Sequence, residues 1–448
     1  MRVTQAVVAG ALLALAAPLA PAAAETLTEA LALAYANNPT LRAARATVRV
    51  ADEAVPQALS GWRPTVRFNS TYGKQYTDNQ GAPAVSLTPF VNRLTVDQPL
   101  YRGGRTVAGT REAESRVLAA RERLRATEQQ VLLDAVIAYL DVLRDQAVVE
   151  LGRNNERVLR RQLEATRDRF EVGELTRTDI AQSEARLSRA TSERISAEGE
   201  LVASRATYMR VIGIAAGALA LAPPYGELPR GEDEALSIAE AESPALLAAR
   251  YDEQAAGHAV REVTGSLLPT LSLSGELSRT EESSTFFAST DQGRLFAQLS
   301  VPLYQSGSVW SQARQARETQ NERRIRIDES RRDVIEEVTQ AWEALQTSRA
   351  RIQSDGDQVR ANEIALEGVR EETTVGARTI LDVLDAEQEL LNSRVSLVRA
   401  ERDEYVAAHR LKQAVGRLSA QHLGLAVDLY DPGSHYQAVR GKLFGFGD

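Results

Sequence analysis

Four stretches of the chain alternate apolar and polar residues, which is the period of a β-strand with one apolar face. Their apolar positions are, in chain order, Val66, Phe68, Tyr72 and Tyr76; Phe90, Leu94, Val96 and Leu100; Leu271, Leu273 and Leu277; and Leu295, Ala297, Leu299, Val301 and Leu303. The stretches are about ten residues long or longer, the length that a tilted transmembrane strand needs. They predict two β-hairpins, at about 64–101 and 269–304.

Two hairpins per chain cannot form a closed barrel, because four strands fall short of the working minimum of about eight. The four strands would also leave two unpaired edges, which native proteins avoid exposing. An apolar strand face could instead pack on a soluble core, but the chain offers no separate core-forming domain to cover it. We therefore expect several copies of the chain to associate, each contributing two hairpins.

After each hairpin the period changes from two residues to seven, the repeat of helices packed along a coiled-coil seam. Four series of apolar residues show it: Leu124, Val131 and Ala138; Ile327, Val334 and Ala341; Ile352, Val359 and Leu366; and Leu384, Leu391, Val398 and Tyr405. They predict two very long helices, about 105–171 and 308–374, each followed by a second helix, about 177–213 and 380–415. A helix of about 65 residues is about 100 Å long, which suits a conduit or spacer better than a compact domain.

The second half of the chain repeats the first. The corresponding positions are Pro64 and Pro269, Thr65 and Thr270, Pro99 and Pro302, Leu100 and Leu303, Tyr101 and Tyr304, Gly104 and Gly307, Tyr139 and Trp342, Gly173 and Gly376, and Gly213 and Gly416. This nearly constant separation indicates the duplication of a unit of about 200 residues. We assign repeat 1 to 25–235 and repeat 2 to 236–448. Each repeat holds a helix, a hairpin, a long helix, a second helix and an equatorial segment that wraps the middle.

The turns between the paired helices carry clear stop and start signals. Gly173 and Gly376 stand where the long helices should end, the usual place for a left-handed residue. In each turn a Thr-x-x-Asp capping box then opens the next helix, with Asp179 and Asp382 as its acids. These two turns define one end of the molecule, and the hairpin loops define the other.

The N-terminal segment has the pattern of a secretory signal peptide. Arg2 precedes an apolar stretch at 6–19, and the alanines at 22–24 form a small-x-small cleavage site. A membrane anchor needs about 20 apolar residues, so we predict a cleaved signal peptide at 1–24. The best later apolar run, 211–222, is also too short for a transmembrane helix, so any membrane insertion must use strands.

The composition of the chain excludes several kinds of chemical site and argues against one class of partner. The chain has no cysteine, which excludes disulfides, thiol nucleophiles, zinc–thiolate sites and a lipid anchor on cysteine. Its four histidines are scattered without metal-ligand spacing. The net charge of −8 argues against nucleic acid as a partner, because phosphate binding requires a basic face. We expect no catalytic residues, no metal and no cofactor.

The two helix turns carry the most specific signature. Residues 169–180 read RFEVGELTRTDI, and residues 374–387 read TVGARTILDVLDAE. These runs strongly resemble the paired VG…D motifs of the TolC-like outer-membrane efflux family. The Pro-Leu-Tyr-x-x-Gly pair at 99–104 and 302–307 resembles that family's junctions between barrel and helices. The resemblance covers nearly the whole chain beyond the signal peptide and includes the duplication.

The resemblance implies a mixed, mainly α-helical fold that assembles as a homotrimer. Three protomers with four strands each would form a 12-stranded transmembrane β-barrel in the lipid of the cell outer membrane, continued by a long α-helical tunnel in the periplasm. The periplasmic end of the tunnel would be closed at rest. A periplasmic adaptor (membrane fusion) protein and an inner-membrane transporter would open it. The implied function is the exit channel of a tripartite efflux or type I secretion system.

The same resemblance implies a periplasmic gate, held by polar contacts between neighbouring inner helices. Thr178 and Asp179 match the acceptor side of that gate, and Arg378 matches its basic partner. Asp382 and Asp385 match a ring of acids that lines the narrowest point. We therefore expect the gate and the acidic ring to lie at the two helix turns.

Some features of the turns depart from the family pattern or have a simpler reading. Thr373 stands where the family has an aromatic residue, and Glu401 where it has an arginine, with Arg402 next to it. The acids of the two capping boxes have a simpler explanation, because acidic residues are favoured in the first turn of any helix. Asp385 differs from them, because it lies beyond the cap and its counterpart in repeat 1 is Gln182.

Two other classes of protein compete with a channel. A periplasmic adaptor or structural coiled-coil protein would share the long helices, but it would lack the two transmembrane-type hairpins and the duplication. A hydrolase would need a Ser/His/Asp or carboxylate constellation, and the chain contains no supporting motif for one. The sequence does not identify the exported cargo.

Overall fold

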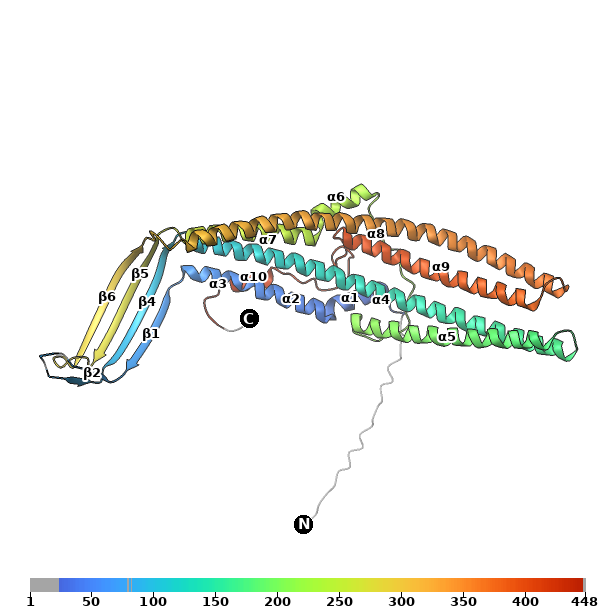
Figure 1. The fold of residues 1–448 in the computed structure, drawn as a ribbon, viewed down its shortest axis with the longest axis horizontal. Coiled ribbons are helices and arrows are strands. Elements are labelled where there is room, and N and C mark those ends of the chain that lie inside the picture. The colour runs from blue at the N-terminus through green and yellow to red at the C-terminus, as the bar shows by residue number, and fades with distance from the viewer. Residues whose placement is uncertain (1–23, 79, 82, 446–448) are drawn as a thin grey trace, which may run out of the picture.

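The computed structural model describes residues 24–78, 80–81 and 83–445. Of the predicted signal peptide at 1–24, residues 1–23 lie outside this part of the chain. The protein forms a long rod with a β-sheet at one end and two helix turns at the other (Figure 1). Within the described residues, no helix is both long and apolar enough to cross a membrane.

The two halves of the chain contribute elements in a similar order. The helices are α1 (Leu27–Asn37), α2 (Pro39–Asp52), α3 (Ala54–Leu59), α4 (Arg105–Glu171), α5 (Arg177–Ile212), α6 (Glu232–Glu242), α7 (Pro244–Gly265), α8 (Ser308–Thr374), α9 (Ile380–Ala414) and α10 (Ser434–Arg440), with a short 3-10 helix η1 (Ser60–Trp62). The strands are β1 (Thr65–Tyr72), β2 (Gln75–Thr77), β3 (Val85–Leu87), β4 (Phe90–Arg102), β5 (Thr270–Glu281) and β6 (Ser289–Ser300). The fold is thus mixed and mainly helical.

Four strands form one antiparallel sheet in the order β1-β4-β5-β6. The first hairpin pairs β1 with β4 and the second pairs β5 with β6. β4 also pairs with β5, with a register shift between Pro99 and Tyr101, so the two hairpins continue into a single sheet. The short strands β2 and β3 pair with each other in the loop between β1 and β4.

The apolar side chains of this sheet are uncovered in the single chain. Phe68, Tyr72 and Leu295 keep 66%, 74% and 76% of their surface exposed. Strands β1 and β6 form the two edges of the sheet, each with one neighbouring strand. Exposed apolar faces and free strand edges are sites of association. The sheet therefore requires surroundings that cover its face and its edges.

The helices α4 (Arg105–Glu171) and α8 (Ser308–Thr374) span 67 residues each. The sequence predicts long helices at about 105–171 and 308–374. Helices α4 and α8 start directly after Gly104 and Gly307, whose φ angles of 76° and 75° allow the sharp bend out of the sheet. α5 packs along α4 and α9 packs along α8, while α7 lies against both long helices. The rod therefore consists of two long helix pairs that run side by side (Figure 1).

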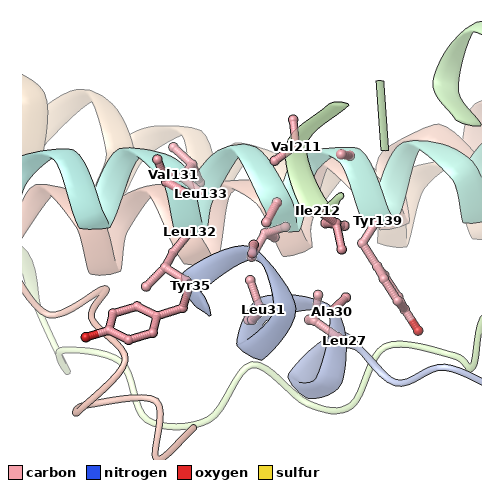
Figure 2. Close-up of a cluster of buried hydrophobic side chains, with 14 of the residues drawn as sticks. Leu27, Ala30, Leu31, Tyr35, Val131, Leu132, Leu133, Tyr139, Val211 and Ile212 are labelled. Carbon is pink, nitrogen blue, oxygen red and sulfur yellow. The ribbon is translucent and has the colours of Figure 1, made fainter. Parts of the chain in front are cut away.

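The largest apolar core lies at mid-length of the rod. Here α1 and residues 418–425 pack against α4 and the end of α5 (Figure 2). Tyr139 and Tyr208 are fully buried in it, with ring centroids 6.4 Å apart. Apolar side chains from both ends of the chain thus meet around one stretch of α4.

The segment that follows α5 is fastened across the middle of the rod. The hydroxyl of Tyr139 donates to the carbonyl oxygens of Glu25, at 2.8 Å, and Ala220, at 2.6 Å. Further along, the hydroxyl of Tyr225 donates to Glu404 at 3.0 Å and accepts from Arg349 at 2.8 Å. This equatorial segment therefore joins α4 of the first half to α8 and α9 of the second.

The C-terminal segment is fastened to the first half of the chain in the same way. Nδ1 of His435 lies 3.0 Å from Oδ2 of the fully buried Asp52. Arg440 donates to Glu114 of α4 at 2.9 Å. The helix α10 thus lies across α2 and α4, close to the sheet end of the rod (Figure 1).

Candidate gate at the helix turns

Two turns form the end of the rod that is opposite the sheet, one between α4 and α5 and one between α8 and α9 (Figure 1). Gly173 and Gly376 adopt φ angles of 82° and 80° there, in the left-handed region that glycine enters without strain. The amides of Glu174 and Ala377 then donate back to the last turn of the long helix, at 2.9 Å each. Both turns therefore reverse the chain with the same geometry.

Asp179 and Asp382 each close a capping box. Oδ2 of Asp179 accepts from the amide and the hydroxyl of Thr176, both at 2.8 Å. Oδ2 of Asp382 accepts from the same groups of Thr379, at 2.9 and 2.8 Å. The backbone hydrogen bond, followed by that from the hydroxyl, lowers the pKa of each carboxyl. The caps therefore stabilise the helices above the ordinary aspartate pKa and weaken as pH falls through the lowered pKa.

Arg378 lies in the second turn and is half exposed. Its Nε donates to Glu372 at 2.9 Å, and its Nη1 lies 4.0 Å from Oδ1 of Asp382. The hydrogen bond to Glu372 is the main cause that raises the pKa of Arg378. Thr178 is exposed on the first turn of α5. The expected contact between Asp179 and Arg378 concerns neighbouring helices of an assembly, so it stays a prediction for this single chain.

Asp385 lies one turn beyond the second capping box and pairs with Arg186 of α5. This ion pair crosses from the second half of the chain to the first. The side chain of Asp385 is 56% exposed and that of Arg186 is 27% exposed. Asp382 thus caps α9, whereas Asp385 pairs with an arginine of α5. Their arrangement as a ring around an axis stays a prediction.

Sequence reasoning missed two partners at this end of the rod, Glu372 and Arg186. The first is separated from Arg378 by the glycine turn, and the second is seven residues beyond Asp179 on the same helix face. The spacing of seven is a usable signal, because it places Arg186 two turns above the first capping box. Nothing in the spacing points to Asp385 as its partner, 199 residues away.

The positions that depart from the family pattern have other contacts. The hydroxyl of Thr373 donates to the carbonyl of Val369 in the same helix, at 2.7 Å. Burial raises the pKa of Glu401. Arg402 donates to Asp141 of α4, with nitrogen–oxygen distances of 2.9 and 2.8 Å. Within the described residues, no group of three or more His, Asp or Glu side chains is placed to hold a metal ion.

Comparison with known proteins identifies the family and the fold. The family model described as outer membrane efflux protein matches the chain twice, at residues 30–213 and 235–417. The chain is 37% identical over 432 residues to the outer membrane efflux protein BepC of Brucella suis, covering 95% of this chain and 92% of that protein. It is 27% identical over 407 residues to the outer membrane protein TolC of Vibrio cholerae, covering 89% and 92%.

The solved structure of CusC has a similar fold. The TM-score is 0.78 at 19% sequence identity, and the match covers 88% of this chain and 92% of that one. The two matches to one family model lie in successive halves of the chain, and the relatives are matched over nearly their whole length. The chain belongs to the outer membrane efflux protein family.

Proposed function

We propose that this protein is the outer-membrane exit channel of a tripartite efflux or type I secretion system. The observation that carries the proposal is the continuity of an uncovered amphipathic sheet with helices of 67 residues. A helix of that length spans about 100 Å, which is far more than a compact domain needs. One molecule thus offers a membrane-inserting end and a long tunnel wall, and it acts by conducting cargo and not by catalysis.

The native assembly in this proposal is a homotrimer. The single sheet has two free edges, β1 and β6, and four strands cannot close on themselves. Three copies joined edge to edge would give a 12-stranded barrel, with the exposed side chains of Phe68 and Tyr72 available to lipid or to neighbouring strands. The helices would continue the barrel as a tunnel in the periplasm, where an adaptor protein and an inner-membrane transporter dock.

Fractionation and cross-linking test this proposal against the periplasmic adaptor or structural coiled-coil protein. An exit channel should sediment with the outer membrane and give trimers when cross-linked in detergent. A coiled-coil adaptor exposes no membrane-type sheet and should be released with the periplasm or the inner membrane. Monomers or dimers alone after cross-linking would contradict the trimer.

Within the proposed trimer, Thr178, Asp179 and Arg378 form the periplasmic gate. We expect Arg378→Ser to raise single-channel conductance in planar bilayers, because the change removes the guanidinium group that would pair with Asp179 in the gate. Arg169→Ser is the matched control, since Arg169 makes an exposed ion pair of 2.9 Å with Glu174 in the equivalent turn of the first half. Conductance equal to wild type in both Arg378→Ser and Asp179→Ala would mean that these residues only cap and pack.

Asp382 and Asp385 form the acidic constriction of the proposed tunnel. Three protomers would bring six carboxylates to a narrow axis, and such a ring concentrates cations. We expect alanine at both positions to weaken cation selectivity, measured as the reversal potential under a salt gradient, and to abolish most block by multivalent cations from the periplasmic side. Asp357→Ala is the control, because Asp357 is an exposed carboxylate paired within α8 to Arg360. A reversal potential unchanged in the double variant would place the constriction elsewhere.

A further inference from the structure

The two long helix pairs of one protomer are joined by few charged contacts. Among the ion pairs of the described residues, two connect α4 or α5 to α8 or α9. Arg402 with Asp141 lies near mid-length, and Arg186 with Asp385 lies near the turns. The second pair is therefore the charged connection closest to the end that must open.

An apolar contact underlies the pair of Arg186 and Asp385. Leu159 of α4, Ala190 of α5 and Ile380 and Leu384 of α9 are all buried together, with exposed fractions of 2–6%. The start of α9 thus packs on the first helix pair. Residues 186 and 385 lie within one or two turns of this cluster on their helices, so the ion pair stands at its margin.

Two acids that flank the pair have partners other than Arg186. Glu184, two residues earlier on α5, pairs with Arg167 at 2.7 Å. Glu387, two residues beyond Asp385, pairs with Arg370 of α8. The flanking acids are therefore engaged within their own helix pairs, and Arg186 pairs across to Asp385.

We propose that Arg186 is a latch residue, which holds α9 against α5 in the closed tunnel and neutralises Asp385 there. The inference rests on the proposed function, and it adds a contact within each protomer to the gate between protomers. When the helix pairs separate, the latch breaks and the carboxylate of Asp385 is freed. The acidic constriction would then carry less uncompensated charge when closed than when open, so Arg186 also sets cation selectivity.

The size of the effect follows from the trimer. A partly exposed ion pair shifts an equilibrium by at most about fivefold. Three identical latches that open together would multiply to about a hundredfold at most. A weak contact can thus set the resting state of the channel and still yield to a docking partner.

The test uses the full-length trimer in planar bilayers, with conductance and reversal potential as readouts. We expect Arg186→Glu to raise the open fraction and the cation selectivity, because each protomer loses the latch and gains a carboxylate. The exchange of both charges, Arg186→Asp with Asp385→Arg, should return the open fraction toward wild type. Arg189→Glu is the control, since Arg189 lies one turn away on α5 and pairs within that helix to Glu193.

The outcomes separate the latch from the proposed function. Wild-type conductance for Arg186→Glu, or an exchange variant as open as the single variant, would overturn the latch and leave the channel intact. A folded wild-type trimer that never conducts would overturn the proposed function, and the latch with it. The latch is supported if the exchange variant recovers and the control variant Arg189→Glu behaves like wild type.

Discussion

Replacing Gly103 with serine is expected to lower the stability of the folded protein by about 2–5 kcal/mol, from left-handed backbone strain and from overpacking. Gly103 has a φ of 64°, at the junction of β4 and α4. A Cβ atom there would lie 2.1 Å from the carbonyl oxygen of Gly265 and 3.0 Å from Cβ of Leu268. Because the nearer atom belongs to backbone that joins α7 to the sheet, no side-chain rotation relieves the clash.

The second half of the chain supplies the control for Gly103→Ser. Ser306 occupies the equivalent junction between β6 and α8 and adopts a φ of 53°. Serine is thus accommodated in the same backbone conformation at a position where its side chain is exposed. Thermal unfolding followed by circular dichroism should show a large fall in Tm for Gly103→Ser and little change for Ser306→Gly. Equal Tm values for Gly103→Ser and wild type would contradict the close crossing of the two junctions.

Tyr139→Ala is expected to destabilise the middle of the rod by about 3–5 kcal/mol, the usual cost of deleting a buried aromatic ring. Tyr139 is fully buried between α1, α4 and α5 (Figure 2), and its hydroxyl holds the carbonyls of Glu25 and Ala220. Burial is the main cause that raises its pKa to about 12, so the hydroxyl remains a donor at neutral pH.

Tyr139→Phe removes the hydroxyl and keeps the ring, so it measures the contribution of the hydroxyl alone. It should cost about 1–3 kcal/mol, because two carbonyl oxygens lose a shared donor inside the protein. Urea unfolding of the three proteins should order them as wild type, Phe and then Ala in decreasing stability. Tyr76→Ala is the control, since Tyr76 is 69% exposed in the short strand β2, outside the four-stranded sheet. An alanine variant as stable as wild type would mean that the mid-length core does not hold the equatorial segment.

The helices could be predicted because their signals are local. Leu124, Val131 and Ala138 recur at seven residues within one helix, and a left-handed glycine followed by a Thr-x-x-Asp box needs no distant contact to form. The strand period was equally local. These features depend on residues within a few turns of one another, which is the range over which sequence patterns are informative.

The contacts between the two halves could not be predicted. Arg186 with Asp385, and Arg402 with Asp141, join residues about 200 or more positions apart, and their spacing on each helix is shared by many other charged side chains. The pairing of β4 with β5 likewise depends on how two distant hairpins meet. The proposed gate residues, such as Asp179, rest on resemblance to a family, because an acid in a capping box has the same local pattern with or without a gate.

Single-channel recording of the purified wild-type protein in planar bilayers tests the central claim most directly. If the chain is an outer-membrane exit channel, folded trimers should insert and give discrete conductance steps, small at rest because the periplasmic end is closed. Folded protein that adds no conductance at any protein concentration or voltage would contradict an exit channel.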